Sequence, residues 1–232
     1  MRQRLASFIK AEIHGWTLFE KVWMLASVLV ILMLSLYWGD SLIGIVSAVT
    51  GVLYVLFNGK GKLSAYIFGI VNTVTYSYIS FVAGYYGEVM LNMLYFLPMC
   101  FVGWYMWKSH IDTSSGEVAK KRLTFKGSVV VYSLTAVAVI VYGYILGALG
   151  GTLPYVDSMS TIISITAQIL CVRRYAEQWV LWTLVNAITI VLWGIDFSSG
   201  GDGIATLLMW IVYLISGIIM FVKWHRESVP KN

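Results

Sequence analysis

Charged residues are scarce in this chain of 232 residues. Aspartate, glutamate, lysine and arginine together make up 12% of it, whereas about 25% is usual in a soluble domain. Hydrophobic residues make up 59%, and a water-soluble fold of this length could not bury so much apolar surface. The few charges lie at the ends of long apolar runs, as insertion into a bilayer requires. We therefore predict an integral membrane protein.

Cysteine and histidine are also rare, and neither forms a pattern that binds metal. Cys100 and Cys171 both lie inside apolar runs, and there is no C-x-x-C pair. The three histidines, His14, His110 and His225, lie in separate polar flanks. We expect no metal site and no cofactor, and we interpret the cysteines as small buried hydrophobic residues.

The chain also lacks the motifs of enzymes and of nucleotide-driven pumps. It has no G-x-x-x-x-G-K-[ST] motif, no nucleophile beside a base, and no acid–base pair inside an apolar run. Charged residues are missing from the middle of every core run, where proton relays normally need them. We expect no catalytic residues and no enzymatic activity, and a facilitator is favoured. Because backbone carbonyls can form a sodium site, an ion-coupled symporter is the alternative.

Apolar runs of about 17 to 25 residues are long enough to cross a bilayer as helices. The first such run is long and lacks an A-x-A cleavage signal, so we interpret it as a retained helix rather than a signal peptide. The sequence predicts eight membrane-spanning helices, at 22–38, 41–57, 63–83, 89–107, 127–149, 156–172, 178–196 and 203–222.

All 16 lysines and arginines lie in alternate flanks of these runs. The positive-inside rule makes that side the cytoplasm and predicts that both termini are cytoplasmic. The net charge of +5 then reflects topology, and no nucleic-acid binding is expected. The run Lys120-Lys121-Arg122 is expected to contact anionic head groups. The opposite side carries only acids, most of which we interpret as loop and helix-capping residues: Asp40, Glu88, Asp157, Asp196 and Asp202. A weak attraction for cations at this mouth is the alternative.

The second half of the chain repeats the first. Aligning Asn72 with Asn186 brings three runs onto three runs without a gap, with equal loop lengths. Both copies start on the acidic side, so the repeats are parallel and the run 127–149 inverts the chain between them. Parallel repeats are a transporter architecture in which the substrate lies at the repeat interface.

This repeat predicts an all-α membrane protein with 3+1+3 helices and one extra N-terminal helix. The expected parts are the N-terminal flank and extra helix, the first triple-helix bundle, the linker with the inverting helix, the second bundle and a tail. Their bounds are 1–40, 41–108, 109–154, 155–226 and 227–232.

Amides and aromatic rings are the main polar groups inside the spans. Such groups suit a flat, neutral or cationic aromatic ring that bears hydroxyls. Trp179 could instead belong to an interfacial aromatic belt, and Trp182 and Asn186 could be packing contacts between helices. We predict a substrate cavity lined by Trp182, Asn186, Gln168, Asn72, Tyr76, Asn92, Tyr95, Ser164, Tyr54 and Trp179.

Two segments resemble the PnuC family of vitamin transporters. The first is YGEVMLNMLYFLPMCFVGWYMWK, preceded by Gly69-x-x-Asn72. The second is AQILCVRRYAEQWVLWTLVNAI, with the signature R-Y-x-E-Q-W-x-x-W-x-x-x-N. The resemblance covers 41–226.

Resemblance to PnuC proteins implies a fold similar to SWEET sugar carriers, a homotrimer and a location in the bacterial inner membrane. It implies import of nicotinamide riboside by facilitated diffusion through alternating access, with trapping by intracellular phosphorylation. Similar family members carry thiamin or riboflavin, which are the alternative substrates.

Overall fold

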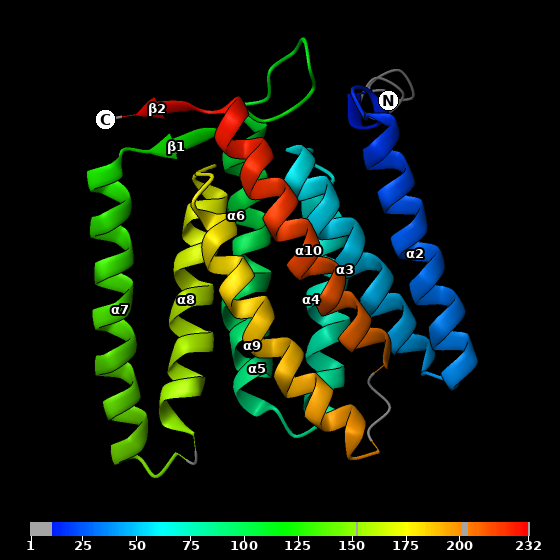
Figure 1. Ribbon diagram of the computed structural model, residues 1–232, viewed down its shortest axis with the longest axis vertical. Helices are drawn as coiled ribbons and strands as arrows, with labels where there is room; N and C mark the ends of the chain where they lie inside the picture. The colour runs from blue at the N-terminus through cyan, green and yellow to red at the C-terminus, as the bar shows by residue number, and fades with distance from the viewer. Residues whose placement is uncertain (1–10, 152, 201–203, 232) are drawn as a thin grey trace.

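The computed structural model describes residues 11–151, 153–200 and 204–231, and it is almost entirely helical (Figure 1). Within those ranges, eight helical spans are long and apolar enough to cross a membrane, which confirms the predicted fold class. Arg2, Arg4, Lys10 and Asp202 lie outside the described residues. The spans are α2 (Leu18–Trp38), α3 (Leu42–Lys60), α4 (Ala65–Val82), α5–η1–α6 (Tyr86–Leu91, Asn92–Phe96 and Leu97–Lys108), α7 (Phe125–Ala148), α8 (Pro154–Val172), α9 (Gln178–Ser198) and α10 (Ile204–Glu227).

Small polar residues and glycines set where the first helices begin and end. Thr17 and Glu20 form a capping box at the start of α2, and the Ser41 hydroxyl accepts from the Gly44 amide at the start of α3. Gly61 ends α3 in the left-handed conformation, with φ of 80°. The turns are therefore short, and α2, α3 and α4 pack as consecutive antiparallel neighbours.

The fourth span contains a π-helical turn. Segment η1 (Asn92–Phe96) follows α5 directly, and α6 continues with Pro98 in its first turn. Proline has no amide hydrogen, so the preceding turn must widen or bend. The Asn92 side-chain amide donates to the Glu88 carbonyl at 2.8 Å. The wider turn changes which residues face the interior in the part of the span that follows it.

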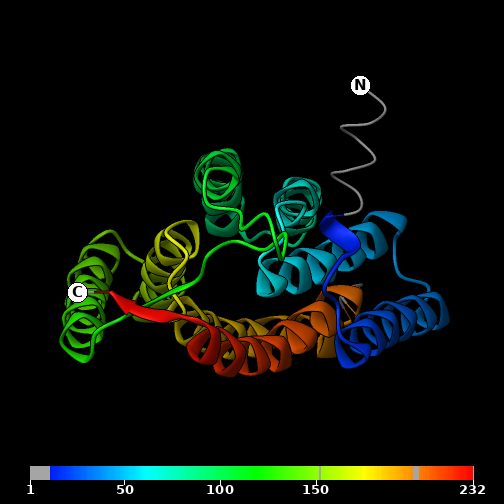
Figure 2. The ribbon, with the colours of Figure 1, turned by 90° about the horizontal axis from the view of Figure 1, so that it is seen from above.

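The spans pack as two sets of three. Helix α4 contacts α3 and α6, and α9 contacts α8 and α10. The two sets meet where α3 packs against α10 and α6 packs against α8. Helices α2 and α7 lie at opposite edges, α2 against α3 and α10, and α7 against α8 (Figure 2). The division into bundles at 41–108 and 155–226 stays a prediction.

An ion-pair network ties the helices together at the lysine-rich end of the bundle. Lys60 Nζ lies 2.9 Å from Glu20 Oε2 and 3.2 Å from Glu117 Oε1. Lys120 Nζ lies 2.9 Å from Glu117 Oε2, and Lys223 pairs with Glu20. Burial opposes ionisation of Glu117, but the two lysines outweigh it and hold the pKa of this carboxyl below its usual value. We call these residues the basic-end network.

This network corrects the expectation for Lys120. Its side chain is only 4% exposed because it lies between carboxylates, so it is not available to lipid head groups. The strand β1 (Lys121–Leu123) that follows pairs in parallel with β2 (Val229–Lys231). The linker is further held by the Lys62 ammonium, which donates to the carbonyls of Ala11, Ser115 and Gly116.

We expect Gly103→Ala to lower the apparent Tm of the purified protein. The added Cβ would overlap the ring of Tyr66, which is fully buried with its centroid 5.2 Å from that of Trp107. Overpacking of this kind costs about 1–3 kcal/mol. Gly194→Ala is the matched control, since no described atom lies within 4 Å of its added Cβ. Equal Tm values for the two variants would contradict a tight α4–α6 contact.

Candidate functional site

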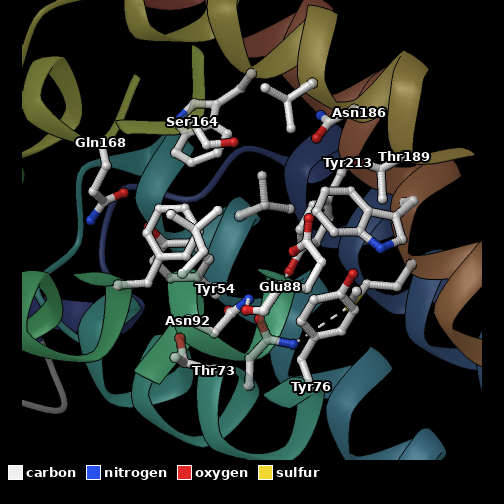
Figure 3. A pocket seen from close by; sticks show the side chains of 18 of the residues that line it. Tyr54, Thr73, Tyr76, Glu88, Asn92, Ser164, Gln168, Asn186, Thr189 and Tyr213 are labelled. Atoms are coloured by element: carbon white, nitrogen blue, oxygen red, sulfur yellow. Dashed lines mark hydrogen bonds between the residues drawn. The ribbon is translucent and has the colours of Figure 1, made fainter. Parts of the chain in front are cut away.

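A cavity lies between the two sets of helices. Together with the open solvent at its mouth it spans about 870 Å³ of space not occupied by atoms. Its lining comes from α3, α4, the fourth span, α8, α9 and α10 (Figure 3). All of the predicted site residues except Tyr95 line it, namely Tyr54, Asn72, Tyr76, Asn92, Ser164, Gln168, Trp179, Trp182 and Asn186.

Tyr95 does not line the cavity. Its hydroxyl donates to the Ile165 carbonyl at 2.9 Å and so ties the fourth span to α8. A regular α-helix would place Tyr95 on the same face as Asn92. In this span, which contains a π turn, the residues that line the cavity are Glu88, Leu91, Asn92, Phe96 and Cys100.

Residues related by the internal repeat face the same cavity. Tyr54 on α3 corresponds to Gln168 on α8, and Asn72 on α4 corresponds to Asn186 on α9. A cavity lined by equivalent positions of both copies is the arrangement expected for parallel repeats with a site at their interface.

Two of the amides predicted to line the cavity have polar atoms without partners among the described residues. Gln168 is 1% exposed, and neither its Oε1 nor its Nε2 has a hydrogen-bond partner among the described residues. Asn186 is 2% exposed, and its Oδ1 likewise has none. A buried polar atom without a partner costs about 1–3 kcal/mol. The cavity therefore presents donors and acceptors that a bound molecule could satisfy.

Asn72 is different because its amide is already engaged. Its Nδ2 donates to the Ser47 carbonyl at 2.9 Å, and its Oδ1 accepts from the Tyr213 hydroxyl at 3.5 Å. It thus joins α4 to α3 and α10 while it lines the cavity. The hydrogen bonds of Asn72 therefore indicate a residue that joins helices rather than one that is free to bind a substrate.

The tryptophans of α9 are interior residues. Trp179 is 2% exposed and lines the cavity, so the interpretation of it as an interfacial belt residue is wrong. Trp182 is half-buried, with its ring centroid 6.0 Å from that of Phe96 across the cavity wall. These rings present flat apolar faces next to the unpaired amides.

Aromatic clusters lie toward both ends of the cavity. Toward the lysine-rich end, the Trp224 indole donates to the Gly59 carbonyl at 2.6 Å, and its ring centroid lies 5.9 Å from that of Trp179. Toward the other end, the Trp193 indole donates to the Tyr76 hydroxyl at 2.9 Å. Both hydrogen bonds join the first set of helices to the second.

The main lining residue that sequence reasoning missed is Glu88. Its position at the start of a span suggested a solvated capping residue, but its side chain reaches into the cavity (Figure 3). Ser160 Oγ donates to Glu88 Oε1 at 3.5 Å. A sequence signal was available, because Glu88 precedes Asn92 by one helical turn. The other polar residues missed are Asn58, Thr73, Ser160, Thr189 and Tyr213.

Comparison with known proteins identifies the family. Residues 41–226 match a family described as nicotinamide mononucleotide transporter. The chain is 39% identical over 217 residues to the nicotinamide riboside transporter PnuC of Neisseria mucosa, covering 91% of this chain and 82% of that one. It is 33% identical to its Haemophilus influenzae counterpart, over 96% of each.

The fold comparison agrees. A crystal structure of the vitamin B3 transporter PnuC superposes with a TM-score of 0.86 and 38% identity, over 95% of this chain and 96% of that one. The chain belongs to the PnuC family.

The tryptophan–asparagine signature shared with PnuC proteins divides into two parts in this structure. Arg174 and Glu177 hold the linker, through an Arg174 bond to the Ala119 carbonyl at 3.1 Å and a Glu177 bond from the Leu123 amide at 3.0 Å. The later members of the signature line the cavity, namely Trp179, Trp182 and Asn186. The segment 174–186 thus contacts the linker at its start and lines the cavity further along.

We expect Gln168→Leu to raise the apparent Tm of the ligand-free protein, because it removes a buried amide that has no partners among the described residues. The expected gain in the free energy of unfolding is about 1–2 kcal/mol. Asn72→Leu is the matched control and should lower Tm, because it breaks the bond to the Ser47 carbonyl. Equal losses of Tm in both variants would show that the Gln168 amide already has partners.

Proposed function

We propose that this protein carries nicotinamide riboside across the bacterial inner membrane. The observation that carries the proposal is the set of unpaired amide atoms beside tryptophan rings in a cavity between two helix bundles. Nicotinamide riboside has a flat pyridinium ring, a carboxamide and ribose hydroxyls. The rings of Trp182 and its neighbours would stack on the pyridinium, and Gln168 and Asn186 would bond the hydroxyls or the carboxamide. The two relatives are nicotinamide riboside transporters, which supports the same substrate.

The charges of the cavity favour the riboside over the mononucleotide. Among the described residues, no lysine, arginine or histidine lines the cavity, and Glu88 does. A phosphate group is usually held by arginine, lysine or a set of backbone amides. A phosphate placed beside the Glu88 carboxylate would instead be repelled. The lining therefore supports a substrate without a phosphate.

We further propose alternating access with gates at the two aromatic clusters. The Trp193–Tyr76 bond would open in one half of the cycle, and the Trp224–Gly59 bond would open in the other. Small rearrangements of packed bundles are how transporters with internal repeats expose one site to two sides in turn. The basic-end network would then face the cytoplasm, in line with the positive-inside rule.

Facilitated diffusion is our first proposal for the energetics. Intracellular phosphorylation of the riboside would trap it and keep the inward gradient. An ion-coupled symporter is the second candidate, because Glu88 is a carboxylate inside the cavity, the kind of group that proton relays use. The resemblance to PnuC proteins also supports a homotrimer, while thiamin and riboflavin remain the competing substrates.

We expect uptake into proteoliposomes to be saturable for nicotinamide riboside and absent for nicotinamide mononucleotide, thiamin and riboflavin. The expected initial rate is unchanged when protonophores and sodium ionophores collapse the gradients, because facilitated diffusion needs none. Uptake of the mononucleotide would contradict the inference that the cavity lining excludes a phosphate group. Loss of initial uptake with an ionophore would favour the symporter.

We expect Trp182→Ala and Asn186→Ala each to weaken nicotinamide riboside binding by about 1–3 kcal/mol, through loss of a stacking face or of a polar partner. Isothermal titration calorimetry of the detergent-solubilised protein measures this without relying on tryptophan fluorescence. Tyr95→Phe is the control and should bind as the wild type does, since Tyr95 lies outside the cavity lining. Unchanged affinity in both folded alanine variants would place the site elsewhere.

A further inference from the structure

Glu88 combines a charge with a position inside the cavity. It lies in the first turn of α5, and its side chain points toward the middle of the lining, in the region of Asn92 and Tyr76 (Figure 3). The π-helical turn that follows keeps Glu88, Asn92 and Phe96 on one face of the fourth span. The carboxylate therefore belongs to the same wall as the predicted binding residues.

No cation of the protein balances this carboxylate among the described residues. The ion pairs there involve Glu20, Glu117 and Glu227 at the lysine-rich end, far along the helices from Glu88. The one hydrogen bond to its carboxylate oxygens comes from Ser160, at a long 3.5 Å. A carboxylate that is partly removed from water and unpaired is unfavourable. A cation arriving in the cavity would remove that penalty.

The proposed substrate brings such a cation. An N-substituted pyridinium carries a fixed positive charge that no proton transfer can remove, so the charge must be balanced when the ring leaves water. Tryptophan faces attract a cationic ring only in part. A carboxylate in the same cavity supplies the remaining attraction, and it does so only for a charged ring.

We propose that Glu88 is the counter-charge of the substrate and determines specificity for a cationic ring over a neutral ring of the same shape. This inference rests on the proposed function, since it assigns a role toward that substrate. Glu88 attracts the cationic ring electrostatically, while the amides and indoles contact the groups that cationic and neutral ligands share. Asp157, exposed at the start of α8, lies on the same side of the bundle but does not line the cavity.

The test compares two ligands that differ in ring charge. Nicotinamide riboside is cationic, whereas its 1,4-dihydro form is neutral and keeps the ribose and the carboxamide. Calorimetry of the full-length protein measures both affinities in the wild type, in Glu88→Gln, in Glu88→Asp and in the control Asp157→Asn. Size-exclusion profiles and apparent Tm values establish that each variant is folded.

We expect the wild type and Asp157→Asn to prefer the cationic ligand. Glu88→Gln should lose about tenfold or more in affinity for it, as expected for removal of a charge-assisted contact, while affinity for the neutral ligand changes by less than about threefold. Glu88→Asp, which keeps the charge on a shorter side chain, should retain part of the preference. This variant also provides the test if Glu88→Gln does not fold.

Three results would overturn the inference. Equal losses for both ligands in Glu88→Gln would indicate a structural role. Glu88→Gln could instead bind both ligands with wild-type affinity. If uptake by the wild type depended on a proton or sodium gradient and uptake by this variant did not, Glu88 would be assigned to ion coupling. Failure of the wild type to bind either ligand would overturn the proposed function itself. This result differs from the first one, in which the wild type binds and Glu88→Gln loses equal affinity for the cationic and the neutral ligand.

Discussion

Polar groups inside a bilayer must find partners within the protein, because the surrounding hydrocarbon offers none. Several hydroxyls of these spans meet this demand locally, as when Thr75 and Thr135 donate to carbonyls one turn earlier in their own helices. Asn72 meets it across helices, through Ser47. The Gln168 amide and the Asn186 carbonyl do not meet it, and both face the cavity. Where such a group also lines the cavity, a ligand can satisfy it, whereas the Asn72 bond holds helices together.

The two ends of the cavity are held by different interactions. At the lysine-rich end, the basic-end network and the β1–β2 pairing join α2, α3, the linker and α10. At the other end, the cross-bundle contacts include the indole–hydroxyl bond between Trp193 and Tyr76 and the bond from the Ala205 amide to the Asp40 carboxylate. Coupled ion pairs therefore hold the lysine-rich end, whereas separate hydrogen bonds hold the other end.

The fourth span shows how a local irregularity determines a site. Pro98 removes a backbone donor, and the preceding turn from Asn92 widens into a π-helix. That widening turns Phe96 toward the cavity and leaves Tyr95 against α8. π turns often occur at functional positions for this reason, since one inserted residue re-aims the side chains on either side of it.

The sequence by itself determined the eight spans, the alternation of basic and acidic flanks, the internal repeat and nine of the residues that line the cavity. These properties depend on hydropathy and charge along the chain, and a bilayer converts both directly into structure. Only the tertiary structure distinguished Asn72 from Asn186, which look equivalent in the repeat, because the difference lies in what packs opposite each amide. It alone also placed Glu88 in the cavity, Tyr95 outside it and Lys120 in buried ion pairs. Helix phase and contacts between distant segments decide these positions.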